Sequence, residues 1–420
     1  MKYALNDRPR LIPLMLYGLQ WWVITLPCIV IMGLIAARLQ GMSLEEQVFS
    51  LQKLFALMGL IILVQTYFGH RLPLVVGPAS TLLVGIVASS AAGPNAMFSA
   101  ICIGGLLLAL AAFSGLVSRA RLFFTPRIVA VILVLIAFTL SPSILALVLS
   151  GSAFLVAQLY FAIGLVLGML VINALLKGVG KSLTVFLGMG IGTGLYAVFF
   201  ALPPLPELEN SAPLALLIPE FHFEPGTVLS FLFCFLALTI NELGSVESIG
   251  HMLKADDMPG RIQRGSAIQG LGNMAAGAMG VMGPVDFSLS AGVISATGCA
   301  SRFTLVPAGI GLVACAFAPQ VVLFLCAIPA PVMGALMLYL MATQLASGLT
   351  MLVQERGITN FATGLTVGLP LMIGLLVAFT PAEVFSGLPA LLRPIAGNGF
   401  VMGTITVILM EHFGNRKTTS

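Results

Sequence analysis

The sequence predicts an all-α integral membrane protein with fourteen transmembrane segments. Hydrophobic residues make up 59% of the 420-residue chain and charged residues only 8%, whereas a soluble domain carries about 25% charged residues. Apolar stretches of about 20 residues recur along the whole chain, and each is long enough to cross about 30 Å of hydrocarbon. A surface so poor in charge has to face lipid rather than water.

The fourteen apolar stretches follow one another with short loops between most of them. Their expected bounds are 11–36, 51–68, 73–89, 95–117, 126–140, 153–176, 182–201, 227–251, 265–282, 284–297, 303–317, 321–345, 359–379 and 391–413. The third and the tenth are short. The first is much longer than the apolar region of a signal peptide, so we expect it to remain in the protein.

Basic residues set the expected orientation. With a cytoplasmic N-terminus, sixteen of the nineteen Lys and Arg residues fall on the inside, which leaves Arg38, Lys53 and Arg393 on or near the outside. The longest outer loop, 202–225, has no basic residue and carries four acids, Glu207, Glu209, Glu220 and Glu224. This pattern predicts a multi-pass protein of the inner membrane with both termini in the cytoplasm. It also explains the basic pI of 8.8 without nucleic-acid binding.

The sequence holds no sign of an enzyme, a cofactor or a metal site. No GxSxG motif, complete Walker loop or histidine cluster occurs. The cysteines are scattered singly in mostly apolar stretches, which is typical of small buried residues: they are Cys28, Cys102, Cys234, Cys299, Cys315 and Cys326.

A Gly-Pro break occurs twice, as VVGPAS at 75–80 and as VMGPVD at 281–286, with an offset of 206 positions between the glycines, 77 and 283. A weaker echo, TPRIVAVIL from 125 and PAPVMGALM from 329, has an offset of 204. If seven segments repeat as seven more, the odd number makes the second copy enter the membrane from the opposite side. The third and tenth segments are then equivalent partners in an inverted repeat.

Both Gly-Pro segments are poor candidates for continuous helix, because proline interrupts the hydrogen-bond ladder and glycine lowers helix propensity. The stretch 285–290 also alternates with a period of two, like a strand. Paired interrupted segments indicate a midplane substrate site, where free amides and helix N-termini hold a polar ligand; a packing kink is the alternative. We expect the residues after the two prolines to face each other, so that Ser80 and Ser288 lie close together.

Three acids lie at membrane depth, where charged residues usually mark a transport pathway or a proton relay. Glu242 is near the middle of the eighth segment and is the first candidate for proton coupling; the alternative is a buried structural anchor. Asp286 follows the second Gly-Pro pair and is the next candidate, although it can also cap the following helix. Glu247 is the third, and with His251 one turn later it can instead form an interfacial pair.

Neutral groups around the expected crossing of the third and tenth segments complete the candidate binding site. Any single Ser or Thr in a membrane helix can also bond its own backbone, and Phe287 can stack on a planar substrate or pack in the interior. The neutral candidates are Gln20, Ser80, Thr81, Asn241, Ser245, Phe287, Ser288 and Ser290.

The segment pattern, the YGLQ stretch at 17–20 and the SAGVISATG stretch at 290–298 resemble the nucleobase–ascorbate transporters, which include uracil and xanthine permeases. The resemblance implies seven-plus-seven inverted repeats, with a core domain (1–118 and 227–318), a gate domain (119–201 and 319–420) and an extracytoplasmic loop (202–226) between them. It also implies alternating access, uptake of a small-molecule nucleobase coupled to protons or sodium, and frequent assembly as homodimers.

Two positions depart from this family's pattern. In the tenth segment Gly292, Thr297 and Gly298 fit the family frame, but Leu289 stands at the substrate-binding Gln or Glu position and Ser290 at the Asn position. In the eighth, alignment on Gly244 puts Asn241 at the family's acid position and Ser245 at its His or Asp position, with Glu242 the nearest acid. Leu289 keeps open a second hypothesis, an anion carrier of the sulfate-permease type with the same fold, and a channel is a third.

Overall fold

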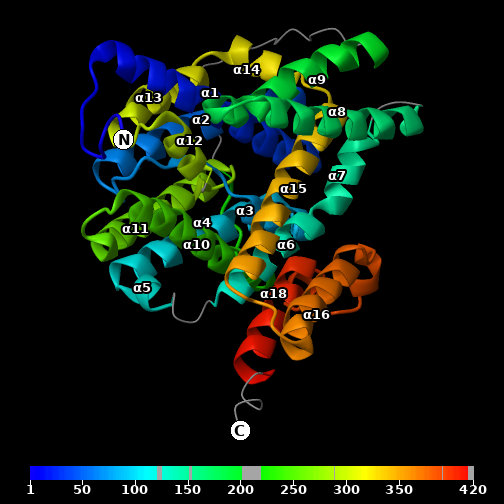
Figure 1. The fold of residues 1–420 in the computed structure, drawn as a ribbon. Helices are drawn as coiled ribbons and strands as arrows, with labels where there is room; N and C mark the ends of the chain where they lie inside the picture. The colour runs from blue at the N-terminus through cyan, green and yellow to red at the C-terminus, as the bar shows by residue number, and fades with distance from the viewer. Residues whose placement is uncertain (121–124, 151–153, 201–218, 288, 390, 415–420) are drawn as a thin grey trace.

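The computed structural model covers residues 1–420 and describes all of them except 121–124, 151–153, 201–218, 288, 390 and 415–420 (Figure 1). The first half contains α1 (Leu11–Leu39), α2 (Leu44–Tyr67), β1 (Val75–Pro78), α3 (Ser80–Ala88), α4 (Pro94–Phe113), α5 (Leu116–Ala120), α6 (Pro126–Thr139), α7 (Ser141–Val148), α8 (Leu155–Leu175) and α9 (Thr184–Phe200). The second half contains α10 (Pro225–Leu253), α11 (Met258–Met279), β2 (Pro284–Phe287), α12 (Ser290–Thr297), α13 (Leu305–Ala316), α14 (Pro319–Cys326), α15 (Ala330–Gln354), α16 (Phe361–Ala378), α17 (Arg393–Ala396) and α18 (Gly399–Leu409). Most of the long outer loop expected from the sequence, with Glu207 and Glu209, lies outside the described residues.

Within the described residues, eight helices are long and apolar enough to cross a membrane, with α6 and α7 taken together, and a bent helix pair makes a ninth. The outward face of α8 carries large exposed apolar side chains, as at Tyr160, Leu167, Val171 and Leu175. Such a face is stable only against lipid. The chain is therefore a multi-pass membrane protein.

The prediction of one continuous segment at 321–345 is wrong. Residues 319–326 form the separate helix α14, which follows α13 at a bend of 87°, and α15 begins only at Ala330. Pro319 and Pro331 explain the breaks, because a residue that precedes proline is disfavoured in the helical conformation.

Helix α11 begins earlier than the predicted bound at 265. Its first residue is Met258, and the side chain of Asp257 caps it by accepting a hydrogen bond from the Gly260 N–H. The first turns carry Arg261 and Arg264. Because these residues are charged, the apolar stretch in the sequence begins only after them.

Small residues let two helix pairs approach closely. A Cβ atom at Gly105 of α4 would collide with the backbone of α11 near Met274, and one at Gly277 of α11 would collide with the backbone of α4 near Cys102. Helices α2 and α13 meet in the same way where Gly59 faces Gly309. Close contact through small residues is the usual way in which membrane helices pack.

Helices α6 and α15 pack against each other along one side of the molecule. Helices α8 and α9 also contact α15, while α16 and α18 pack together and α18 contacts α6 (Figure 1). On the other side α4, α10 and α11 lie together. Strand β2 contacts α10 and α11 of this second group, and β1 contacts α1 and α2.

The interior is mostly apolar, with single buried polar side chains such as Gln158 of α8 and Thr404 of α18. Phe55, Phe231 and Phe400 are fully buried, and all six cysteines are unpaired, five of them buried and Cys102 half-buried. Buried polar and charged side chains gather where α2, α10 and α11 meet β1 and β2. This cluster is the first part of the candidate site.

Candidate functional site

Strands β1 and β2 form a two-stranded antiparallel sheet. Val75 pairs with Phe287, Val76 with Asp286, Gly77 with Val285 and Pro78 with Pro284. The two Gly-Pro stretches, far apart in the sequence, therefore lie side by side. The Ala79 N–H extends the ladder by donating to the Gly283 carbonyl at 3.0 Å.

The expectation that the residues after the two prolines face each other is wrong. Because the strands are antiparallel, the chain after Pro284 runs back toward Val75, whereas the chain after Pro78 leaves the sheet into α3. Ser80 therefore lies beyond the end of the ladder where Pro78 meets Pro284. Ser288 lies outside the described residues, but its neighbour Phe287 is at the other end.

Each glycine of the two Gly-Pro pairs leaves room for a side chain. The ring of Phe287 lies against Gly77, where a Cβ atom would stand 2.6 Å from the ring Cζ. Gly283 makes the same room for the amide of Asn273 on α11. Phe287 is half-buried in this position, so the ring packs on the sheet.

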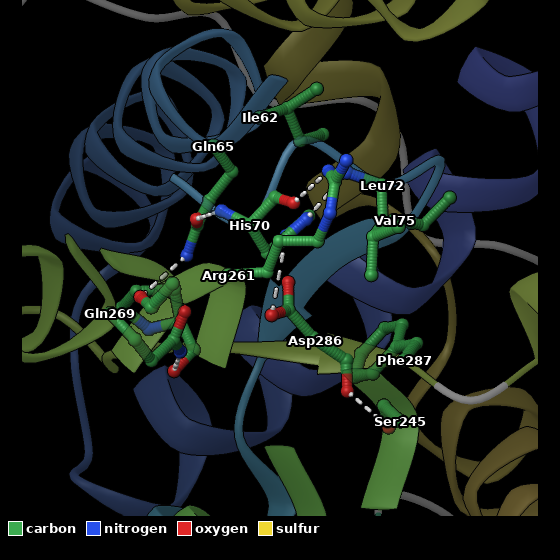
Figure 2. A network of polar contacts seen from close by, with 12 residues as sticks. Ile62, Gln65, His70, Leu72, Val75, Ser245, Arg261, Gln269, Asp286 and Phe287 are labelled. Atoms are coloured by element: carbon green, nitrogen blue, oxygen red, sulfur yellow. Dashed lines mark hydrogen bonds and ion pairs between the residues drawn. The ribbon is translucent and has the colours of Figure 1, made fainter. Parts of the chain in front are cut away.

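Asp286 is fully buried and faces His70, which follows the end of α2. The His70 Nε2 atom lies 3.5 Å from Asp286 Oδ2, and both side chains have no exposed surface (Figure 2). The Leu72 N–H donates to His70 Nδ1 at 2.9 Å. In the neutral imidazole, the proton is therefore on Nε2 and points at the carboxylate.

Glu242 is the second buried acid of this cluster. Its carboxyl group has no exposed surface, lies within electrostatic reach of Asp286 and faces the hydroxyl of Ser266 on α11. Within the described residues, neither oxygen of Glu242 or of Asp286 has a hydrogen-bond partner. Buried carboxyl oxygens are normally paired, so this cluster is exceptional.

Side-chain amides of α2 and α11 and an arginine of α11 lie around the carboxyl groups of Glu242 and Asp286. Gln65 Nε2 donates to the Gly265 carbonyl at 3.0 Å, and Gln269 donates to the Pro284 carbonyl of β2 (Figure 2). Arg261 donates to the His70 carbonyl at 2.9 Å and to Asp256 Oδ1 at 2.7 Å. This guanidinium lowers the pKa of Asp256, which lies in the turn before α11.

Two of the predicted serines hold the backbone. Ser245 donates to the Asp286 carbonyl at 3.1 Å and to the Asn241 carbonyl at 3.0 Å. Ser290 donates to the Phe287 carbonyl at 2.9 Å and accepts from the Val75 N–H at 3.0 Å. Both hydroxyls thus fix β2 between α10 and β1.

The other neutral candidates spread around the sheet. Thr81 is buried, and its Oγ1 has no hydrogen-bond partner within the described residues, as is also true of Gln20 Nε2. Ser80 and Asn241 are half-buried. The structure thus brings Glu242, Asp286 and Ser245 together. Gln20, Ser80, Thr81 and Asn241 lie outside this group.

Glu247 lies elsewhere, on the face of α10 that looks toward α6 and α15. It lines a cavity of about 250 Å³ with Gly244 of the same helix, Val129 of α6, Met351 of α15, and Glu355 directly after α15. Glu242 comes one and a half turns earlier on α10 and faces the opposite way, into the buried cluster. The two acids of this helix therefore belong to different sites.

Residues at the start of α12 are also open. Leu289 is 38% exposed, and a Cβ atom at Gly292 would meet nothing within 4 Å.

A second cavity of about 350 Å³ lies near the C-terminal end of α3, with Glu224, Arg393 and Asn398 in its lining. Within the described residues, no three His, Cys, Asp or Glu side chains lie close enough together to hold a metal ion.

Sequence reasoning missed His70, Arg261 and Gln269. His70 falls in the short link between the second and third predicted segments, where a histidine reads as an interfacial residue. Its contact with Asp286 spans more than 200 positions, and no local pattern reports it. The one available signal was its place five residues before β1, in the stretch FGHRLP at 68–73.

A family model described as the Permease family matches residues 13–383. The chain is 23% identical to the uric acid permease PucJ of Bacillus subtilis over 363 residues, which are 83% of this chain and 80% of that protein. It is 24% identical to the xanthine permease of Bacillus subtilis over 408 residues, 91% of this chain and 89% of that one. The solved transmembrane domain of the cyanobacterium bicarbonate transporter BicA matches with a TM-score of 0.64 at 14% identity, covering 89% of this chain and 98% of that one. This last likeness is one of fold.

Proposed function

Since the chain belongs to the nucleobase–ascorbate transporter family of permeases, we propose that it carries a purine-type nucleobase, such as xanthine or uric acid, across the membrane. The family match over residues 13–383 is the observation that carries this proposal. The two relatives named above are permeases of uric acid and xanthine, which favours these purines over uracil.

The proposed architecture is fourteen segments in two inverted repeats of seven, with β1–α3 and β2–α12 as the broken third and tenth segments. The helix pairs α4–α11 and α2–α13 support it, because they would join the fourth segment to the ninth and the eleventh to the second. In a seven-plus-seven repeat the second segment corresponds to the ninth and the fourth to the eleventh. The two helix pairs are therefore equivalent under the repeat symmetry. The core domain (1–118 and 227–318) and the gate domain (119–201 and 319–420) follow from the same proposal. We further propose that the protein is a homodimer in the inner membrane and that both termini lie in the cytoplasm.

The proposed substrate site is the cavity between α10 of the core and α6 and α15 of the gate. Glu247 is its best placed ligand, because a carboxylate accepts hydrogen bonds from N–H groups on the edge of a planar base. A site between two domains also suits alternating access, since relative movement of the domains opens it to either side.

The proposed coupling ion is a proton, bound by the buried carboxyl pair of Glu242 and Asp286. Two neighbouring carboxylates without hydrogen-bond partners cannot both stay ionised in an apolar interior, so we expect one of the two carboxyl groups to hold a proton. The cluster is separate from the cavity, which suits an ion that controls the movement of the core rather than one that contacts the substrate.

Uptake into proteoliposomes tests the proposed function. Labelled xanthine, uric acid, uracil and sulfate are supplied outside, with a pH gradient (acid outside) or a sodium gradient imposed. We expect saturable, proton-driven uptake of xanthine or uric acid. Sulfate uptake that no nucleobase inhibits would instead support the anion carrier, for which the apolar Leu289 at the base-binding position is the supporting observation.

A substitution in the cavity tests the site. Glu247→Gln replaces one of the two acceptor oxygens by an NH₂ donor at the edge of the base, and an unmatched buried group costs about 1–3 kcal/mol. We expect the Kd for xanthine to rise about 5- to 150-fold. Glu383→Gln, at an exposed position outside the cavity, is the matched control and should leave the Kd unchanged.

A further inference from the structure

A histidine, His70, joins the buried carboxyl pair from the side where α2 ends. Its Nε2 lies 3.5 Å from Asp286 Oδ2, and Asp286 is in turn within electrostatic reach of Glu242. The three titratable groups thus form one cluster inside the molecule, and all three are fully buried. None of them lines the cavity that holds Glu247.

Backbone contacts fix the orientation of the imidazole. The Leu72 N–H occupies Nδ1, so Nε2 carries the transferable proton and faces the carboxylate (Figure 2). His70 N–H donates to Gln65 Oε1 at 3.3 Å, and the His70 carbonyl accepts from Arg261. The residue is held at both ends in the pose that points its proton at Asp286.

The charged groups around His70 are already engaged. The guanidinium of Arg261 on α11 binds Asp256 and the carbonyls of His70 and Arg71, and Arg302 donates to the Thr66 carbonyl at the end of α2. Gln269 of α11 is neutral and donates to the Pro284 carbonyl of β2. Within the described residues, His70 is therefore the titratable side chain that contacts Asp286 from the end of the molecule where α2 finishes and α11 starts.

The turn that carries His70 is strained. Arg71 has a φ of +56°, a left-handed conformation that side chains other than glycine adopt rarely. Arg261 holds the carbonyl of this residue at 3.2 Å. Strain of this kind occurs most often at functional sites and switch segments.

We propose that His70 is the proton-transfer residue that connects the Asp286–Glu242 pair with the cytoplasmic side of the membrane. When the turn opens, Nδ1 exchanges the Leu72 N–H bond for a proton from water, and the imidazole becomes a cation. Its Nε2 proton then passes to Asp286 Oδ2, which leaves a neutral imidazole protonated on Nδ1 and a protonated Asp286 carboxyl. For release, water at the open turn moves the imidazole proton from Nε2 to Nδ1; Nε2 then takes the proton of Asp286, and the imidazolium gives its Nδ1 proton to water. This inference rests on the proton coupling proposed above.

The substitution His70→Gln tests the relay. The glutamine amide keeps a hydrogen-bond donor near Asp286 but cannot take up and pass on a proton. In proteoliposomes, exchange of labelled for unlabelled xanthine at equal pH needs no net proton movement, whereas net uptake driven by a pH gradient does. We expect exchange within about twofold of the unaltered protein and gradient-driven uptake at least about tenfold lower. His222→Gln, at an exposed position before α10, is the control and should change neither.

Two results would overturn the proposal. Gradient-driven uptake equal to that of the unaltered protein would show that no proton passes through His70, and equal loss of exchange and net uptake would assign it a purely structural role. If the glutamine variant does not fold, Asp286→Asn, which keeps an acceptor for Nε2–H, should give the same split between exchange and net uptake.

A substrate-free measurement separates failure of the relay from failure of the proposed function. A pH jump on purified protein, followed with a soluble indicator dye, reports proton binding without any nucleobase. We expect His70→Gln to slow proton binding by the carboxyl pair at least about tenfold. Unchanged binding kinetics would contradict the relay, whether or not the protein carries xanthine, and uptake driven by sodium alone would contradict it as well.

Discussion

The contact between Gly77 and the ring of Phe287 predicts that Gly77→Ala destabilises the two-stranded sheet. An added Cβ atom would stand 2.6 Å from the ring Cζ, whereas ordinary contacts begin at 3.4 Å, so the ring has to move. Phe287 belongs to β2 and pairs with Val75, which leaves the ring little freedom to shift without the strand. Overpacking of this kind typically costs about 1–3 kcal/mol.

Equilibrium unfolding of the purified protein in detergent measures this loss. We expect Gly77→Ala to lower the free energy of unfolding by about 1–3 kcal/mol. Phe287→Leu removes the ring, so the double variant should lose less than the sum of the two single variants. Gly164→Ala is the matched control, because a Cβ atom there meets nothing within 4 Å, and it should be neutral or slightly stabilising. Equal stability of Gly77→Ala and Gly164→Ala would refute the reasoning.

Two further predictions concern the cluster and the register. Glu242→Gln cannot bind a proton, so uptake driven by a pH gradient should be abolished in proteoliposomes while exchange persists in part; unchanged gradient-driven uptake would rule out Glu242 as the coupling acid. Cysteines at Val75 and Phe287 occupy paired positions and should form a disulfide on mild oxidation, whereas cysteines at Ser80 and Phe287, at opposite ends of the sheet, should not. The reverse result on gels would reject the antiparallel register.

Much of the helical framework was predictable because lipid imposes a simple pattern. Segments such as 359–379 differ from the observed helix, here Phe361–Ala378, by only two residues at the start and one at the end. Predicted helix bounds were wrong where charged residues or prolines, rather than the run of apolar residues, decide where a helix begins. Arg261 and Arg264 concealed the first turns of α11, and Pro319 begins the separate helix α14.

The sequence indicated that the two Gly-Pro stretches belong together but not how they are arranged. The repeated Gly-Pro pair located the two strands, but a sequence echo carries no information about which residues pair. Periodicity also left the faces of α10 undecided, since Glu242 and Glu247 both lie at membrane depth. Contacts with α11 and β2 direct Glu242 inward, and the gap before α6 and α15 leaves Glu247 in the cavity. His70 needed its partner 216 positions away to be recognised.

The pairing of β1 with β2 has a consequence for how the protein is made. Val75 meets its partner Phe287 only after 212 more residues have been synthesised, which takes about 10–40 s at about 5–20 residues per second. During that time the amide and carbonyl groups of β1 lack their hydrogen-bond partners on β2, and lipid offers them no hydrogen bonds. The nascent first half therefore has to keep this stretch near water or against the insertion machinery until the second half arrives. Slower synthesis between the two strands should lengthen that exposure and lower the yield of inserted protein.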